Sequence, residues 1–433
     1  MITSPTYPET SPPHDLASDF SYFRELVLLN EAGVTEGQAN EFKAIVESAK
    51  PPQSVDDLSL SMLRALAPLD NAHTTVLSPR MHRLPVRFHW TSDALIIVKA
   101  RPEQSALVGQ RVLSLGGKSP EELIANVPRL IGGGTQSWKR YRSEFLYSAP
   151  SALLLLGAQT DGAAVQLEVL SLDGLITETM LEADPVEMPG DPFWDFLDAF
   201  PEDSSFETDG WVNLLTADQP LPLYLQEAER TLFAKALPAE QAVYLRVNGS
   251  FDDKDETISH FGNRVLEMIA EANAQNIIVD FRYNRGGDYT QLLPLVSDLS
   301  EAVPSDGRLY LITGPNTFSA GLVAGSQFKH HIPDQLTIVG SEVGDVLRFK
   351  AEGFAPKLPA SGVQLYITTA WGDVAKGCDW FDDCFLPNKL LVSGVGSMDI
   401  DLPIENTWRA FVDGEDLVLE SIQSDILARQ TPG

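Results

Sequence analysis

The sequence predicts an α/β fold whose second half is built around a layered, largely parallel sheet. The first observation is an alternation of short apolar runs with longer amphipathic ones, over residues 241–248, 257–274, 277–281, 289–299 and 308–313. The short runs are rich in β-branched residues and continuously apolar, which is typical of strands buried on both faces. Strand–helix–strand alternation in turn predicts βαβ units with helices packed on the sheet.

Length and charge indicate a soluble globular protein of two or three domains. The chain has 433 residues, which is too many for one ordinary core. It carries 61 acidic and 31 basic residues, a formal net charge of −30. Nucleic acids and anionic membranes bind to basic surface patches, so the negative net charge argues against both as partners. No apolar run reaches the ~18 residues of a transmembrane helix, so membrane insertion is not expected.

The N-terminal residues do not predict a secretory signal. Residues 1–17 are rich in proline and polar groups and are expected to be a disordered lead-in. Either the protein is cytoplasmic or a signal has been removed. The only two cysteines, Cys378 and Cys384, slightly favour a periplasmic or secreted location, because such close neighbours could close a disulfide loop. Two free thiols are the alternative, and a metal site is not expected because no histidine or third cysteine lies nearby.

The segment 18–80 is predicted to be a small helical N-terminal domain. Apolar residues recur at helical spacing in two stripes, separated by the helix-breaking pair Pro51-Pro52. The segment ends in a polar turn that contains His73, before a strand around Val76.

Residues 81–182 are predicted to form a β module. Short strands are expected at 86–90 and 94–98, followed by a hairpin over 165–181 with a turn at Asp173-Gly174. The run 110–119, with a short helix after it, is similar to part of a PDZ domain but lacks a recognisable carboxylate-binding loop, so we expect a degenerate PDZ-like module. Residues 183–240 are acidic and rich in proline and aromatic residues, and we expect a connector, an insertion or a segment that covers the site.

A serine at a strand-to-helix turn is the first candidate catalytic residue. Ser319 follows the strand 308–313 and precedes a helix of small residues, 320–328. A hydroxyl there faces the positive end of the helix dipole beside unpaired backbone donors, which is the setting of an acyl-transfer nucleophile. A helix N-cap is the simpler role for a lone serine. The paired Gly286 and Gly287 upstream favour the nucleophile, because a glycine turn can expose backbone N–H groups.

Together, the runs 280–287 and 316–321 resemble the core of the tail-specific, or carboxy-terminal-processing, serine peptidases. Both motifs occur in the family's order, each at the end of a strand. The resemblance implies a crotonase-like layered peptidase core over residues 241–433, with Ser319 as the nucleophile. It also implies an oxyanion hole formed by the N–H of Ala320 and that of Gly286 or Gly287. A protein or peptide substrate and no cofactor follow from the same resemblance.

The turn around His73 resembles the Asp-x-x-His-Thr segment of the tricorn-like branch of this family, in which the histidine is the general base. The other branch uses a lysine that follows a glycine in the turn after the next strand. This chain has Gly344-Asp345 there, and Lys350 is the less favoured alternative base. The resemblance places the acid of the triad farther downstream, where Asp373 is the first choice and Asp379 the second. A solvated loop acid is the simpler role for either.

The sequence therefore predicts a serine peptidase that works through an acyl-enzyme. Ser319 attacks the peptide carbonyl, His73 takes its proton, and Asp373 or Asp379 orients the imidazole. Two rivals stay open. One is acyl-CoA chemistry on the same core, against which the absence of a basic surface for the CoA phosphates speaks. The other is an inactive pseudopeptidase that binds peptides or other ligands. Oligomeric state and cleavage preference do not follow from the sequence.

Overall fold

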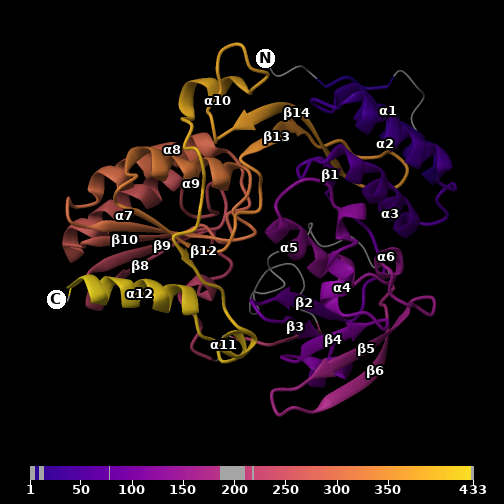
Figure 1. Cartoon of the computed structure of the whole chain (residues 1–433), viewed down its shortest axis with the longest axis horizontal. Coiled ribbons are helices and arrows are strands. Elements are labelled where there is room, and N and C mark those ends of the chain that lie inside the picture. Colours follow the sequence, from indigo (N-terminus) through magenta and orange to yellow (C-terminus); the bar gives the residue numbers. More distant parts are fainter. Residues whose placement is uncertain (1–4, 9–13, 78, 186–209, 217–218, 431–433) are drawn as a thin grey trace.

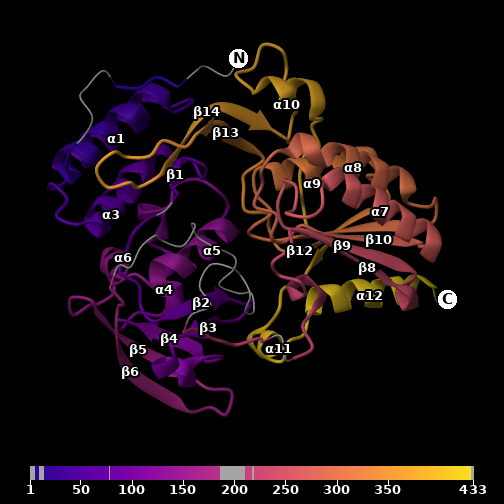
Figure 2. The same ribbon diagram turned by 180° about the vertical axis from the view of Figure 1, so that it is seen from behind.

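The computed structural model describes residues 5–8, 14–77, 79–185, 210–216 and 219–430. Figures 1 and 2 show two halves side by side, the N-terminal half in indigo to magenta and the C-terminal half in orange to yellow. The fold is a mixture of helices and sheets with a helical N-terminal region, as predicted. Within the described residues, no helix has both the length and the apolar character that crossing a membrane requires.

Three helices form the N-terminal region: α1 (Leu16–Asn30), α2 (Glu36–Ser48) and α3 (Val55–Leu66). Each starts where a side chain accepts a hydrogen bond from a backbone N–H of the first turn, at Asp15, Thr35 and Ser54. The helix α1 thus begins within the predicted lead-in. Of the remaining lead-in residues, Tyr7 packs edge-on against Phe354 at 5.9 Å between ring centroids, and residues 1–4 and 9–13 lie outside the described part.

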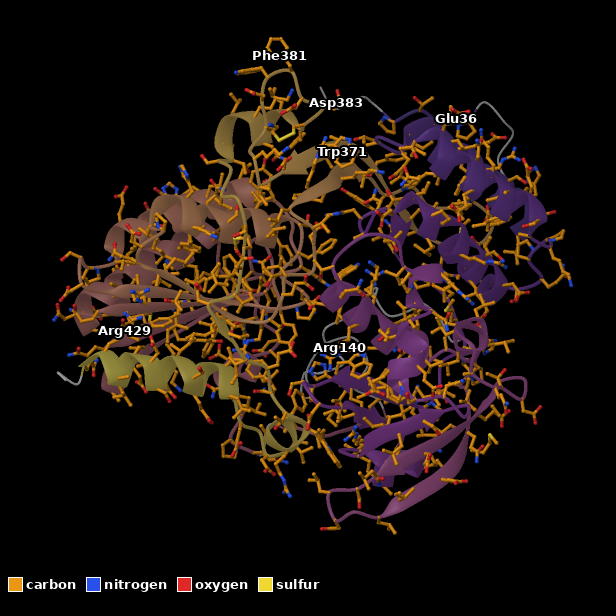
Figure 3. All side chains as sticks on the ribbon, in the orientation of Figure 1. Glu36, Arg140, Trp371, Phe381, Asp383 and Arg429 are labelled. Carbon is orange, nitrogen blue, oxygen red and sulfur yellow. A yellow bond between two sulfur atoms is a disulfide. The ribbon has the colours of Figure 1, made fainter. Side chains whose placement is uncertain are left out.

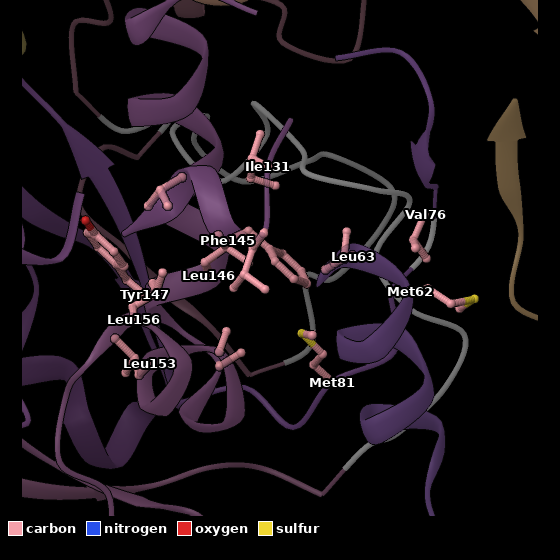
Figure 4. Packing of buried hydrophobic residues seen from close by; sticks show 14 of the residues in the cluster. Met62, Leu63, Val76, Met81, Ile131, Phe145, Leu146, Tyr147, Leu153 and Leu156 are labelled. Atoms are coloured by element: carbon pink, nitrogen blue, oxygen red, sulfur yellow. The ribbon is translucent and has the colours of Figure 1, made fainter. Parts of the chain in front are cut away.

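An antiparallel sheet follows, in the order β2 (Val86–Trp90), β3 (Leu95–Ala100), β4 (Arg111–Leu115), β5 (Ala164–Leu170) and β6 (Ile176–Glu182). A further short strand, β7 (Val212–Asn213), pairs with β3. The predicted hairpin is confirmed as β5–β6. Three helices pack beside this sheet: α4 (Pro120–Ile124), α5 (Gln136–Tyr147) and α6 (Pro150–Leu156). Only α4 was predicted. Figure 4 shows Leu63 of α3 facing Phe145 of α5, so the helical region and the β module share one apolar core.

The second half contains a sheet in the order β15 (Leu402–Pro403), β12 (Leu336–Gly340), β11 (Arg308–Thr313), β10 (Asn276–Asp280), β9 (Ala242–Val247), β8 (Leu232–Leu237). Neighbours from β15 to β9 are parallel, which confirms the predicted parallel sheet. Strand β8 is antiparallel to β9 and comes from the segment 183–240, where no strand was predicted. Within that segment, residues 186–209 and 217–218 lie outside the described part.

Helices cover both faces of this sheet, as Figure 1 shows: α7 (Ile258–Ala272), α8 (Tyr289–Ala302) and α9 (Ala320–His331) on one, and α12 (Leu417–Gln430) on the other. Ile277 and Val279 pack with the first group and Ile278 with α12, as the alternation of side chains along a strand requires. The carboxyl ends of the parallel strands meet at one edge. The candidate site lies at that edge.

A three-stranded ribbon joins the halves: β1 (Thr75–Val76) pairs with β14 (Leu365–Asp373), which pairs with β13 (Arg348–Phe354). After it, Cys378 and Cys384 form the disulfide that the sequence slightly favoured. Figure 3 shows Phe381 at the tip of the bridged loop, turned away from the rest of the protein. The short helices α10 (Leu386–Leu391) and α11 (Trp408–Val412) complete the C-terminal half.

Candidate active site

The turn between β11 and α9 holds Ser319 in an unusual backbone conformation, with φ of +53° and ψ of −124°. A non-glycine residue at positive φ is strained, at a cost on the order of 1–3 kcal/mol, and such strain gathers at functional sites. The Ser319 side chain makes no N-cap hydrogen bond to α9. The N-cap role considered for a lone serine therefore does not describe this residue.

Neighbouring side chains hold this strained turn in place. The buried Thr317 donates its hydroxyl to the carbonyl of Phe281 at 2.8 Å and accepts the N–H of Gly314 at 2.9 Å. The N–H of Phe318 donates to the carbonyl of Asn284 at 3.0 Å. The turn before α9 is thus fastened to the loop after β10, which explains why the two sequence motifs occur together.

That loop contains Gly286 and Gly287 at φ of +109° and +128°. A Cβ on Gly286 would lie 2.8 Å from the Cβ of Ser319, so only glycine allows this approach. The N–H of Gly286 donates to Asn284 Oδ1 at 3.1 Å. Within the described residues, the N–H groups of Gly287 and Ala320 donate no hydrogen bond. Of the two glycines considered for an oxyanion hole, Gly287 is therefore the one whose backbone N–H is available to donate to a ligand.

Ser319, Gly287 and His73 line one cavity of about 290 Å³. Its walls come from the turn before β1, from α5, from the glycine loop, from the turn before α9 and from β14. The remaining lining residues are Ala72, Thr75, Leu77, Trp138, Tyr141, Arg142, Arg285, Asn316, Phe318 and Tyr366. The fold thus brings to one cavity a serine and a histidine that lie far apart in the sequence.

The imidazole of His73 lies between two aromatic rings. Its centroid is 4.4 Å from that of Phe318 and 5.6 Å from that of Phe349, nearly parallel to the second ring. Burial lowers the pKa of His73 to about 3, because a charged imidazolium would lose its hydration there. Neither ring nitrogen has a hydrogen-bond partner among the described residues. The structure therefore holds a neutral imidazole, which is the form that a general base requires.

The carboxylate beside His73 is Asp345, whose Oδ2 lies 3.6 Å from His73 Nδ1. Asp345 follows β12, and its Oδ1 accepts the N–H of Val346 at 3.0 Å. Burial raises the pKa of Asp345 well above its ordinary value, and the backbone N–H groups of Val346 and Ser319 partly oppose that effect. This carboxylate therefore lies next to both the imidazole and the backbone of Ser319.

Close backbone packing fixes the turn that carries Asp345. A Cβ on Gly344 would lie 2.0 Å from the carbonyl oxygen of Pro315, so a glycine is required there. From the other half of the protein, Thr135 donates its N–H to Gly344 O at 3.0 Å and its hydroxyl to Val343 O at 2.7 Å. The N-cap residue of α5 thus holds the Asp345 turn.

The two acids predicted from the sequence have other surroundings. Asp373 ends β14, and its Oδ1 accepts the N–H groups of Ala375 and Lys376 at 3.0 and 2.9 Å. Asp379 is exposed in the disulfide loop, where its N–H donates to Asp382 Oδ2 at 2.7 Å. Neither lines the cavity that contains His73 and Ser319. The structure brings Asp345 to His73 instead.

Lys350, the alternative base, also lies outside this cavity. Its ammonium is 3.8 Å from a carboxylate oxygen of Glu31 and 3.5 Å from the carbonyl of Leu69. Burial lowers the pKa of Lys350, and the nearby Glu31 opposes that shift. The ammonium therefore faces a buried carboxylate and not Ser319.

Helix α5 supplies cavity residues that the sequence prediction missed. Trp138 stacks on Phe318 with 4.1 Å between ring centroids, and Tyr141 and Arg142 line the same space. A signal was present, because Trp138, Tyr141 and Phe145 recur at the i, i+3, i+7 spacing of a helix face. Charged and polar residues between them hide that pattern.

Within the described residues, no group of three or more His, Cys, Asp or Glu side chains is arranged to hold a metal ion. No protein-family model matches the chain, and no curated protein matches it. Solved structures do match. Mature CPAF complexed with lactacystin has a TM-score of 0.60 and 13% identity, over 96% of this chain and 98% of that chain. Mature CPAF alone has the same TM-score and coverage at 11% identity.

A photosystem II D1 C-terminal processing protease is also similar, with a TM-score of 0.37 and 11% identity over 94% of this chain and 99% of that one. At such low identities, the likeness to CPAF establishes the fold. It extends over nearly the whole of both chains, so both halves described above belong to that fold.

Proposed function

We propose that this chain is a serine peptidase of the tail-specific (S41) family, in which Ser319 is the nucleophile and His73 is the general base. The observation that carries the proposal is the backbone of Ser319, strained at a strand-to-helix turn and opening onto a cavity shared with His73. The fold shared with CPAF and the motifs of residues 280–287 and 316–321 support the same assignment.

The proposed reaction begins when Ser319 Oγ attacks a peptide carbonyl while His73 takes the hydroxyl proton. Because Nδ1 of His73 faces Asp345, Nε2 is the nitrogen for this transfer. The N–H groups of Gly287 and Ala320 stabilise the oxyanion of the tetrahedral intermediate. His73 then protonates the leaving amine, and water, deprotonated by the same imidazole, hydrolyses the acyl-enzyme.

In this reaction Asp345 has the role that we expected, from the sequence, for Asp373 or Asp379. A carboxylate beside Nδ1 holds the imidazole in the useful tautomer and stabilises the imidazolium that forms. The 3.6 Å between Asp345 Oδ2 and His73 Nδ1 supports this choice, since the ring has to move only slightly to make a hydrogen bond.

The proposal extends to architecture, substrate and location. The sheet from β9 to β15 with its helices represents a crotonase-like peptidase core over residues 241–433, to which β8 adds an antiparallel edge strand. The sheet from β2 to β6 represents a degenerate PDZ-like module. The substrate is a protein or peptide, and the chemistry uses only side chains and backbone amides. A periplasmic or secreted location agrees with the Cys378–Cys384 bridge, because such bonds persist in oxidising compartments.

A fluorophosphonate probe, which labels activated serines, tests this function. The wild-type protein should be labelled at Ser319, and Ser319→Ala should be neither labelled nor able to hydrolyse peptides. Ser326→Ala is the matched control, because Ser326 lies on the same helix but its hydroxyl donates to the carbonyl of Val323. A wild-type protein that takes no label would contradict the proposal and favour a binding protein without catalysis.

A further inference from the structure

A buried group of polar side chains, which we call the Glu31 cluster, lies against the turn that carries His73. It consists of Glu31, Asn71, Thr74, Lys350 and Thr368. Glu31 caps the C-terminal end of α1, and its side chain has no exposed surface. The other members come from the His73 turn and from the ribbon β13–β14. The cluster therefore joins three segments that are remote from one another in the sequence.

Three donors and one cation surround the Glu31 carboxylate. Asn71 donates its amide at 2.5 Å, the hydroxyl of Thr74 also donates, and that of Thr368 lies at 3.3 Å. The ammonium of Lys350 is 3.8 Å away. Burial raises the pKa of Glu31, and the side chains of Thr74, Asn71 and Lys350, together with the backbone of Thr368, partly oppose that shift. They are the partners that a buried carboxylate needs to remain charged.

The cluster contacts residues on both sides of His73. Asn71 Oδ1 accepts the backbone N–H of His73 at 3.0 Å, while the amide nitrogen of the same side chain donates to Glu31. Thr74 directly follows His73, and its hydroxyl also accepts the N–H of Thr368 at 3.1 Å. The backbone that sets the place of the imidazole is thus fixed by the carboxylate of Glu31.

We propose that Glu31 is a positioning residue for the peptidase reaction, holding residues 71 and 74 and thereby the imidazole of His73 in its place beside Asp345. This inference rests on the proposed function. A buried ion pair adds little stability compared with apolar residues of the same size. The geometry of the turn is what the Glu31 cluster provides. The helical N-terminal region then contributes to the active site, because it supplies the residue that positions His73.

Charge-removing variants separate positioning from stability. Glu31→Gln keeps the size of the side chain but offers one acceptor oxygen to three donors and leaves Lys350 without its carboxylate. We expect kcat to fall by about 10- to 100-fold, the scale of a displacement near 1 Å, with KM changed less than about twofold. Glu25→Gln, on the exposed side of α1, is the matched control and should leave both constants unchanged.

The double variant Glu31→Gln/Lys350→Met removes both buried charges and should regain most of the stability that Glu31→Gln loses. If Glu31 positions His73, kcat of the double variant stays low. If the cluster only stabilises the fold, kcat recovers together with the free energy of unfolding, and the inference is wrong.

A readout without catalysis keeps the inference separate from the proposed function. The imidazole ¹⁵N resonances of His73, assigned by their loss in His73→Gln, should shift or broaden in Glu31→Gln and in the double variant, and stay in place in Glu25→Gln. Unchanged resonances would overturn the inference even in an active enzyme. An inactive wild-type protein would overturn the peptidase proposal, and the resonances would still show whether Glu31 holds His73.

Discussion

His73 is a buried imidazole, and its burial sets the pH range in which it can act as a base. With an ordinary pKa near 6.5, a catalytic histidine loses activity as the pH falls through that value. Burial lowers the pKa of His73 to about 3, so the neutral form should persist into acidic solution. We expect the imidazole of His73 to stay neutral at pH 5. Its ¹⁵N chemical shifts, followed from pH 4 to 8, test this, and a ring that is half-protonated near pH 6.5 would contradict it.

The carboxylate of Asp345 should stabilise the imidazolium that forms during the reaction, but it should lower the stability of the folded protein. Its pKa in the folded protein lies above the unfolded value, so the folded state binds the proton more tightly. Its contribution to stability is therefore present at low pH and is lost as the pH rises above the unfolded pKa, near 3.8. Asp345→Asn removes a buried carboxylate and should raise the free energy of unfolding, more at pH 8 than at pH 5. Urea titrations at both values measure the difference.

The same substitution should lower kcat by about 10²-fold or more, because an amide cannot stabilise the imidazolium. Asp373→Asn and Asp379→Asn are the comparisons, since Asp345 is the carboxylate beside His73 and the other two have different surroundings. Both should remain within about threefold of the wild type. If Asp373→Asn were the inactive variant, the carboxylate named from the sequence would be the right one.

Sequence reasoning could identify Ser319, the glycine loop and His73 as candidates because each lies in a short motif with a local backbone reason. It did not reach Asp345 as a partner of His73. That contact forms through space, where the end of β12 meets the turn before β1. One feature of the sequence could have indicated Asp345. Neighbouring parallel strands end at the same edge of a sheet, so the turn after β12, which carries Asp345, lies near the turn after β11, which carries Ser319.

At the scale of elements, the βαβ half could be predicted because its strands are continuously apolar and its helices amphipathic. The boundaries of β11 agree with the sequence prediction. Helices α5 and α6 were missed, and so was β8, which completes the sheet from within an acidic segment. In α5, five charged or polar side chains interrupt the stripe that packs on the site. Tertiary packing, more than local pattern, makes that segment a helix.

Gly286 lies against Ser319, and Gly286→Ala tests whether activity depends on that close approach. The new Cβ would lie 2.8 Å from the Cβ of Ser319 at φ of +109°. The loop must shift, so we expect both hydrolysis and fluorophosphonate labelling to fall by about 10²-fold, the scale of a small misplacement. Gly117→Ala is the control, because Gly117 also has positive φ but a Cβ there meets nothing within 4 Å.

Both alanine variants should lose about 1 kcal/mol or more of stability, because alanine is strained at positive φ. Only Gly286→Ala should lose activity. Equal activities in the two variants would show that the glycine loop does not need to lie against Ser319.

Over the whole molecule, the site is assembled from two halves that each have a large core, and a smaller buried cluster joins Ile96 of the first half to Tyr283 and Phe411 of the second. His73 and α5 belong to the half whose core contains Phe23 and Leu63, and Ser319 to the half whose core contains Ile277. Phe318 precedes Ser319 yet packs into the first of these cores. The geometry of the candidate site therefore depends on how the halves are held together, which no local sequence pattern expresses.

Thr135 tests that dependence, because it links the halves and also caps α5. Its hydroxyl accepts the N–H of Trp138 at 3.3 Å and donates to Val343 O at 2.7 Å, next to the Asp345 turn. Thr135→Ala should cost about 1 kcal/mol as a lost N-cap. It should also reduce kcat, since the Asp345 turn loses the hydroxyl contact to Val343 O and keeps only the backbone bond to Gly344 O. Thr257→Ala removes the equivalent cap of α7, where Thr257 accepts the N–H of His260 at 3.2 Å, away from the cavity. Its stability should fall by a similar amount in urea titrations while kcat is kept. If both variants kept kcat, the contact between Thr135 and the Asp345 turn would have no part in catalysis.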